Sequence, residues 1–148
     1  MASEHDKGEI EVEVFRRFLG QSGLPIDPSS IEKRLPPEPD ILCRHTFEGE
    51  LAFELVEMCD QNLAKFIAQA SEGYLRTSDP SEIVISKKLQ RSYETTAPIE
   101  LLCYAGRIIS PDNLILPTIA PLFESYRHVF RRAWLLGRKG VYVVWESG

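Results

Sequence analysis

The spacing of hydrophobic residues predicts a helix near the start of the chain. Between residues 6 and 20, apolar positions recur at the period of an α-helix, and Gly20 can end it. These positions are Ile10, Val14, Phe15, Phe18 and Leu19. With successive residues about 100° apart around the helix axis, Glu11 falls in the middle of this apolar face. A carboxylate is unusual there, so Glu11 is a candidate for a buried functional role.

A proline-rich connector follows at residues 21–39. Asp27 and Pro28 can begin a short helical turn that runs to about Leu35. The prolines that come next force extended backbone up to Asp40. We therefore expect the chain to enter its first strand at Asp40.

The pattern after the connector predicts a β-hairpin. One strand covers residues 40–45 and the other covers 50–59. The loop between them is residues 47–49, with Gly49 in the left-handed conformation that glycine tolerates best. This connection makes the two strands antiparallel neighbours.

The loop length predicts the hairpin register. Thr46 pairs with Glu50, and Asp40 then lies opposite Val56, with Glu54 on the same face as a diagonal neighbour. Diagonal neighbours are roughly 7–8 Å apart. A one-residue change of register would instead bring Glu57 to the face of Asp40. We favour Glu54 because of the position of the glycine in the loop.

The rest of the chain alternates between helical and extended patterns. The predicted elements are a helix over 61–71, a helix over 80–93 with a short strand over 83–85 as its alternative, a strand over 99–105, a helix over 117–136 and a strand over 141–145. A hairpin followed by helical crossovers implies a mixed sheet. We expect one α/β domain over residues 1–148, with a central sheet of about four strands flanked by helices.

Composition and charge narrow the possible partners. The chain has 148 residues, 43% hydrophobic and 26% charged, with a net charge of −5. An acidic balance argues against a protein that coats nucleic acid without specificity, because phosphate binding requires lysine and arginine. Basic residues do gather at 87–91 and 127–139. Nucleic acid therefore remains a possible partner at a local site.

The cysteines and the N-terminus point to a cytoplasmic protein. Cys43, Cys59 and Cys103 are far apart, odd in number and set in apolar runs, which is typical of reduced, buried thiols. The N-terminal residues are polar, and no apolar run approaches the ~18 residues of a membrane span. We expect neither a signal peptide nor a membrane partner.

Three carboxylates carry the candidate chemistry. Glu54 lies in an apolar strand, where an ionised carboxylate is costly unless it is paired, hydrogen-bonded or metal-bound. Asp40 and Glu54 could share one Mg²⁺ or Mn²⁺ ion, which prefers oxygen ligands, and Glu11 could be a third ligand.

The same carboxylates also admit structural roles. Asp40 could accept hydrogen bonds from the backbone where the connector enters its strand. Glu54 could pair with Arg44 or Arg107, and Glu11 could reach solvent past the helix edge. Both interpretations stay open at this point.

The sequence Pro39-Asp40, followed by the strand at residues 52–56, resembles the PD-(D/E)XK nuclease signature. The resemblance spans roughly residues 9 to 106. It implies a restriction-endonuclease-like core of a helix, an antiparallel meander, a crossover helix and a further strand, although the first meander strand is not evident in the sequence. It also implies that Asp40 and Glu54 bind Mg²⁺, that a glutamate of the first helix joins them, and that a lysine two positions after the glutamate activates water.

The chain departs from this signature at the lysine, because Val56 stands in its place. Lys88 and Arg91, on the helix predicted after the hairpin, are candidates for a relocated cation. One hypothesis is a metal-dependent nuclease that hydrolyses phosphodiester bonds, with Asp40, Glu54 and Lys88 as catalytic residues. The alternative is a non-catalytic binding or scaffold module, which could form a homodimer through the strand at 141–145.

Overall fold

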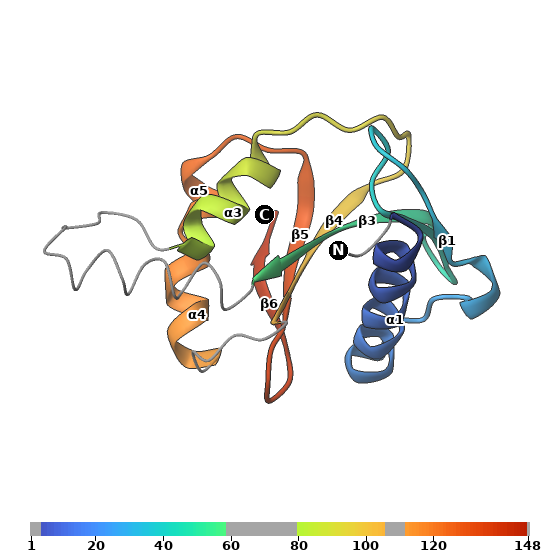
Figure 1. The fold of residues 1–148 in the computed structure, drawn as a ribbon, viewed down its shortest axis with the longest axis horizontal. Coiled ribbons are helices and arrows are strands. Elements are labelled where there is room, and N and C mark those ends of the chain that lie inside the picture. The colour runs from blue at the N-terminus through green and yellow to red at the C-terminus, as the bar shows by residue number, and fades with distance from the viewer. Residues whose placement is uncertain (1–3, 59–79, 106–111, 148) are drawn as a thin grey trace, which may run out of the picture.

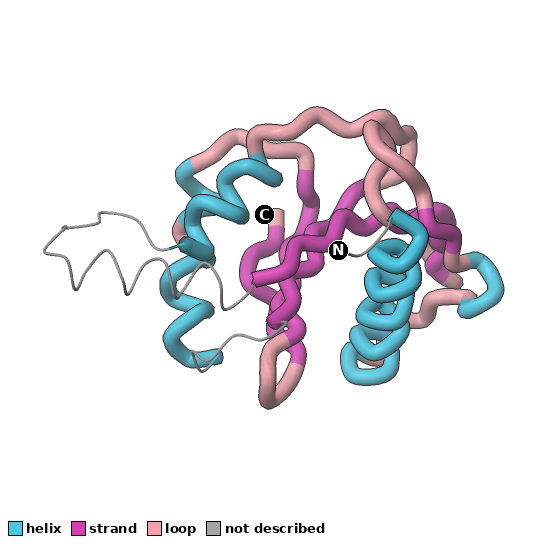
Figure 2. The backbone as a smooth tube through the Cα atoms, viewed as in Figure 1, coloured by secondary structure: helices cyan, strands magenta, loops and turns pink. Residues whose placement is uncertain are grey.

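The computed structural model describes residues 4–58, 80–105 and 112–147, which form a sheet with helices on both faces (Figures 1 and 2). The helices are α1 (Glu4–Ser22), η1 (Pro28–Ser30, a 3₁₀ turn), α3 (Pro80–Leu89), α4 (Asp112–Ile119) and α5 (Leu122–Ser125). The strands are β1 (Glu32–Lys33), β2 (Ile41–His45), β3 (Gly49–Met58), β4 (Ile99–Ala105), β5 (Phe130–Leu136) and β6 (Val141–Glu146). The prediction of a mixed α/β fold is confirmed.

The described strands form one six-stranded sheet in the order of the sequence, β1 to β6. β1, β2 and β3 are antiparallel neighbours, β3, β4 and β5 are parallel, and β6 returns antiparallel to β5. The sequence predicted about four of these strands and missed β1 and β5. Among the described residues, no helix combines the length and the apolar composition that crossing a membrane requires.

Alternating residues of the central strands supply two hydrophobic cores, one on each face of the sheet. On one face, Phe15 and Phe18 of α1 are fully buried against Phe53 and Trp134, and the rings of Phe15 and Phe53 are 4.8 Å apart. Burying such a side chain stabilises the fold by roughly 1.5–3 kcal/mol. α3, α4 and α5 cover the other face (Figure 1). The prediction of an amphipathic first helix is confirmed, except that Ile10, which was placed on the apolar face, is 50% exposed.

The hairpin forms, but its register differs by two residues from the predicted one. His45 pairs with Gly49, which has a φ of 85°, and Arg44 pairs with Glu50. Thr46 cannot pair with Glu50, because its backbone N–H and hydroxyl both donate to the Pro25 carbonyl, at 2.8 and 2.9 Å. The long-range contact with the connector therefore decides the register.

A two-residue shift keeps the same side chains on the same face. Ile41 pairs with Phe53, so the next residues outward, Asp40 and Glu54, lie directly opposite each other instead of diagonally. The structure thus favours Glu54 over Glu57, which is exposed and belongs to the other face of β3.

The helix predicted over residues 117–136 is wrong. α4 begins at Asp112 and contains Pro117, α5 is a single turn, and residues 130–136 form the strand β5. Ala133 and Trp134, which point to opposite faces of the sheet, are both buried. The apolar run at residues 133–136 is buried on both faces, and periodicity cannot distinguish such a short run from part of a buried helix.

The other predictions differ in smaller ways. α3 is a helix, as predicted, but it ends at Leu89 instead of residue 93, and the strand alternative over 83–85 is wrong. Asp27 caps η1 by accepting a hydrogen bond from Ser29 N at 3.0 Å, although the turn is much shorter than predicted. The helix predicted over 61–71 lies outside the described residues.

Asp112 ties the start of α4 to the turn between β5 and β6. Its carboxylate accepts hydrogen bonds from the backbone N–H groups of Arg138 at 2.9 Å and Lys139 at 3.0 Å, and from the Tyr142 hydroxyl at 3.1 Å. A Cβ added at Gly137 would overlap this carboxylate. The glycine is therefore required for the close approach of the turn to α4.

Candidate functional site

Asp40 and Glu54 meet at the point where β2 begins and β3 passes through the middle of the sheet. The Asp40 backbone N–H donates to Glu54 Oε1 at 3.1 Å, and the Leu55 N–H donates to Asp40 Oδ2 at 2.9 Å. The two acids are 14 residues apart in the chain. The second of these hydrogen bonds also bears out the structural role considered for Asp40, that of accepting from the backbone.

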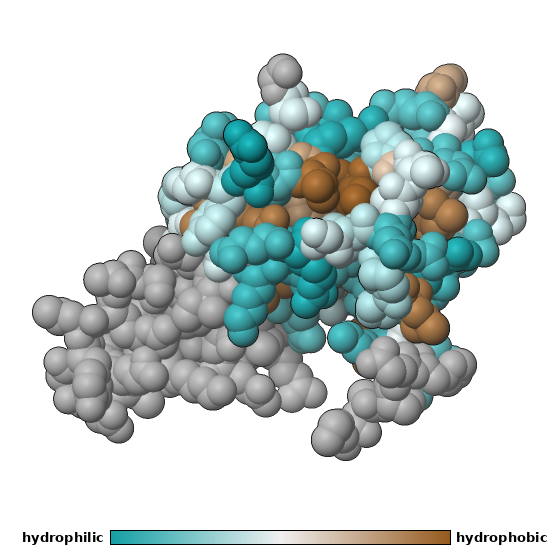
Figure 3. Space-filling view, turned by 90° about the horizontal axis from the view of Figure 1, so that it is seen from above, coloured by the Kyte–Doolittle hydropathy of each residue, from teal (hydrophilic) through white to brown (hydrophobic). Residues whose placement is uncertain are grey.

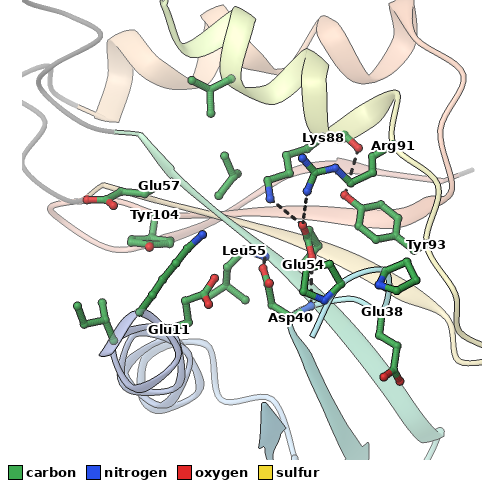
Figure 4. Close-up of a pocket in the computed structure, with 16 residues that line it drawn as sticks. Glu11, Glu38, Asp40, Glu54, Leu55, Glu57, Lys88, Arg91, Tyr93 and Tyr104 are labelled. Carbon is green, nitrogen blue, oxygen red and sulfur yellow. Dashed lines mark hydrogen bonds and ion pairs between the residues drawn. The ribbon is translucent and has the colours of Figure 1, made fainter. Parts of the chain in front are cut away.

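Glu54 is buried, with 2% of its surface exposed, and two cations of the α3 region approach it. Lys88, in the last turn of α3, places Nζ 2.7 Å from Glu54 Oε2 (Figure 4). Arg91 Nη1 lies 3.7 Å from the same oxygen. The sequence marked Lys88 as a candidate for the cation that is missing at Val56. The structure places the Lys88 ammonium beside the Glu54 carboxylate.

Val56, at the position where the signature has its lysine, belongs to the hydrophobic core. It is buried with the residues of α3, α4 and α5, on the face of β3 that Glu54 shares. A valine there packs the core and offers no charge. Lys88 reaches Glu54 from the helix that covers this same face (Figure 4).

Glu11 joins the site through a lysine that the sequence did not single out. Lys33 Nζ of β1 lies 3.1 Å from Glu11 Oε1 and 3.2 Å from Asp40 Oδ1. Glu11 is buried on α1, as predicted. Lys33 was missed because β1 is only two residues long and lies in a segment that reads as a connector. No local pattern could have marked it.

Burial and mutual repulsion raise the proton affinity of the carboxylates. Burial, and after it the neighbouring Asp40 carboxylate, raises the pKa of Glu54 and the pKa of Glu11 above their ordinary value. Burial also lowers the pKa of Lys33, but the carboxylates of Asp40 and Glu11 outweigh it, so the net pKa is raised. Lys33 beside Glu11 and Lys88 beside Glu54 act against this rise in pKa.

Tyr93 adds a hydroxyl beside this cluster. It donates to the backbone carbonyl of Lys88 at 3.3 Å. Burial, followed by the charge of Glu54, raises the pKa of its phenol. The hydroxyl therefore stays protonated at neutral pH and can act only as a neutral hydrogen-bonding group.

The acids border a cavity of about 470 Å³, within the range of ligand-binding pockets. Its walls come from α1, the connector, β3, α3, the residues after α3, and β4. The polar residues that line it are Lys7, Glu11, Glu38, Asp40, Glu54, Glu57, Lys88, Arg91, Tyr93 and Tyr104. Figure 3 shows that one face of the described surface has hydrophobic residues gathered in its middle, with hydrophilic residues around them.

Two of the three expected carboxylates, those of Asp40 and Glu54, are suited to bind a divalent ion, and the third is not. Among the described residues, no three His, Cys, Asp or Glu side chains are arranged to hold a metal ion. The three-acid arrangement expected for Glu11, Asp40 and Glu54 is therefore not formed, because Lys33 holds Glu11. Mg²⁺, however, commonly uses one or two carboxylates and completes its shell with water and substrate phosphates. Asp40 and Glu54 can supply that pair, since each carboxylate has about four lone-pair sites.

Other candidate partners and ligands lie away from the site. Arg44, expected as a structural partner of Glu54, is exposed on β2, and Arg107 lies outside the described residues. Cys43 and Cys103 are buried, and burial raises the pKa of each thiol to about 12. These two thiols are packing residues, as predicted, and Cys59 lies outside the described residues.

Comparison of the chain with protein-family models, with curated proteins and with solved structures found no match. The function is therefore inferred from the residues and the geometry of the site.

Proposed function

We propose that this chain is a metal-dependent hydrolase of phosphodiester bonds in nucleic acid, in which Lys88 supplies the cation that Val56 cannot. The contact of 2.7 Å between Lys88 Nζ and Glu54 Oε2 carries the proposal. The two residues are 34 positions apart in the chain, one on α3 and the other on β3. Lys88 approaches from the face of the sheet that also holds Val56, where the signature has its lysine.

The order of elements supports a restriction-endonuclease-like core. α1 is followed by the antiparallel strands β1, β2 and β3, by a connection that contains α3, and by β4 parallel to β3. This is the order that the resemblance implies. β1 supplies the first strand of the meander, which the sequence did not reveal.

Asp40 and Glu54 would hold Mg²⁺ or Mn²⁺. When bound, such an ion lowers the pKa of a water ligand and stabilises developing negative charge on a phosphate. The backbone N–H groups of Asp40 and Leu55 orient these two carboxylates before any ligand arrives. The site is therefore preorganised, and its ligands need little rearrangement.

The cations of the cavity would act on the phosphodiester. Lys88 would hold the attacking water and the phosphate oxygen in position, and Arg91, with a half-exposed side chain, would bind the phosphate at the mouth. Water attacks phosphorus and loses a proton to solvent, the P–O bond to one nucleotide breaks, and the leaving oxygen takes up a proton from solvent. A local group of cations explains how a chain of net charge −5 can bind an anionic polymer.

The test is cleavage of single- and double-stranded DNA and RNA by the purified chain with Mg²⁺ or Mn²⁺. Asp40→Asn, Glu54→Gln and Lys88→Met should each lower the rate by about 10²-fold or more, the usual effect of losing a catalytic group. Lys87→Met is the matched control, because Lys87 is exposed in the same helical turn, and it should cleave like the wild type. Wild-type protein that cleaves none of these substrates would contradict the proposal, as would full activity in Asp40→Asn.

A non-catalytic module is the second candidate, and the ion pairs favour it. Lys33 neutralises Asp40 and Glu11, and Lys88 neutralises Glu54, so the carboxylates are satisfied without a metal. Such a network could serve stability and binding alone. The same assay separates the two candidates: a module of this kind would bind nucleic acid or a protein partner with equal affinity with Mn²⁺ and with a chelator present, and would leave the polymer intact.

A further inference from the structure

Lys33 is held in place on three sides. β1 pairs with β2 through Lys33 and Ile41, and the next residue, Arg34, donates its N–H to the Asp40 carbonyl at 2.8 Å. The Lys33 side chain runs beside α1, where a Cβ added at Gly8 would lie 3.4 Å from Lys33 Cγ. These contacts fix the Lys33 ammonium group between Glu11 and Asp40.

That position is the place where a divalent ion bridging Glu11 and Asp40 would have to sit. The ammonium lies 3.1 Å from Glu11 Oε1 and 3.2 Å from Asp40 Oδ1, and only 23% of the side chain is exposed. Mg²⁺ needs oxygen ligands at about 2.0–2.1 Å, so an ion and the ammonium cannot occupy the gap together.

We infer that Lys33 is a built-in substitute for a second metal ion and a positioning residue for Asp40. The inference rests on the proposed function: the site then takes a single divalent ion, held by Asp40 and Glu54, while Lys33 supplies fixed positive charge on the other side of Asp40. Glu11 does not ligate a metal here. Its role is to hold the Lys33 ammonium beside Asp40.

The experiment counts Mn²⁺ ions bound per full-length chain by calorimetric titration and by electron paramagnetic resonance. Lys33→Met removes the charge and keeps most of the side-chain volume, so this variant should bind one more ion than the wild type. Lys33→Arg keeps the charge and should bind the same number as the wild type. The double variant Lys33→Met/Glu11→Gln should lose the additional ion, because one of its two carboxylates is gone.

Equal Mn²⁺ counts in Lys33→Met and the wild type would overturn the inference, whatever the fall in thermal stability. If Lys33→Met does not fold, Glu11→Gln decides: it should bind the same number of Mn²⁺ ions as the wild type, and a lower number would overturn the inference. A wild type that binds no Mn²⁺ refutes the metal site at Asp40 and Glu54, and so the proposed function. The difference between Lys33→Met and the wild type still decides the role of Lys33.

Discussion

At the scale of single residues, Glu54 is a buried carboxylate whose protonation affects the stability of the fold. Its side chain is almost fully enclosed, and it is held by a backbone N–H on one oxygen and by Lys88 on the other. Desolvation nevertheless dominates, so the folded state binds a proton at Glu54 more tightly than the unfolded state does. A residue kept at such a cost is typical of a functional site.

Glu54 should therefore make the protein less stable as pH rises. Its folded pKa lies above the ordinary value of 4.5, so the free energy of unfolding should fall as pH increases from 4.5 through the folded pKa. In Glu54→Gln this contribution is absent. We expect the free energy of unfolding of the wild type, relative to that of the variant, to fall across this range, measured by urea unfolding at several pH values.

Glu50→Gln provides the matched control for this measurement. Glu50 is exposed on the same strand, so its removal should leave the pH dependence of the wild type unchanged. A Glu54→Gln variant that keeps the wild-type slope would show that Glu54 has an ordinary pKa in the folded state.

At the scale of elements, the fold depends on contacts between segments that are distant in the chain. The connector contacts the hairpin through Pro25 and Thr46 and thereby sets the register that brings Asp40 opposite Glu54. Asp112 joins α4 to the β5–β6 turn in a similar way. In both places a polar group satisfies the backbone of a remote turn.

The contact between Asp112 and the turn predicts that Gly137→Ala destabilises the protein. The new methyl group would overlap the Asp112 carboxylate, which must then move and weaken its hydrogen bonds to the turn. We expect a loss of about 1–3 kcal/mol in chemical unfolding, as for other overpacked sites. Gly140→Ala in the same turn is the control, because its nearest neighbour would be the Tyr142 hydroxyl at 4.0 Å. Equal stabilities for the two variants would argue that the turn adapts freely.

At the scale of the whole molecule, the two edges of the described sheet differ. One edge is β1, whose two residues are too short to serve as a template for another strand. The other is β6, with six residues and an exposed Val143. Any homodimer formed through strand pairing would therefore use β6.

We expect sedimentation equilibrium at high protein concentration to show a weak dimer for the wild type and a monomer for Val143→Lys, because a charge on an edge strand opposes pairing. Val129→Lys is the control. Val129 is similarly exposed but precedes β5, outside the edge strand, and its replacement should leave the dimer intact. A wild type that stays monomeric at every concentration would rule out this assembly.

Local pattern was sufficient for much of the fold and part of the site. The 3.6-residue period marked α1 and placed Glu11 on its buried face, and extended runs bounded by turn residues marked β2, β3, β4 and β6. The face shared by Asp40 and Glu54 was also predictable, because an error of two residues in register does not exchange the faces of a strand. These features depend only on residues that are close together in the chain.

The remaining features arise from contacts between distant residues. Residues 130–136 form a strand whose apolar residues at 133–136 contribute to the cores on both faces of the sheet, and this short apolar run would equally suit a buried helix. Lys33 came to the site because β1 pairs with β2, and Lys88 because α3 covers the face of Glu54. Charge pairs between remote segments leave no periodic signal in a sequence, so only the assembled sheet could show which cations meet these acids.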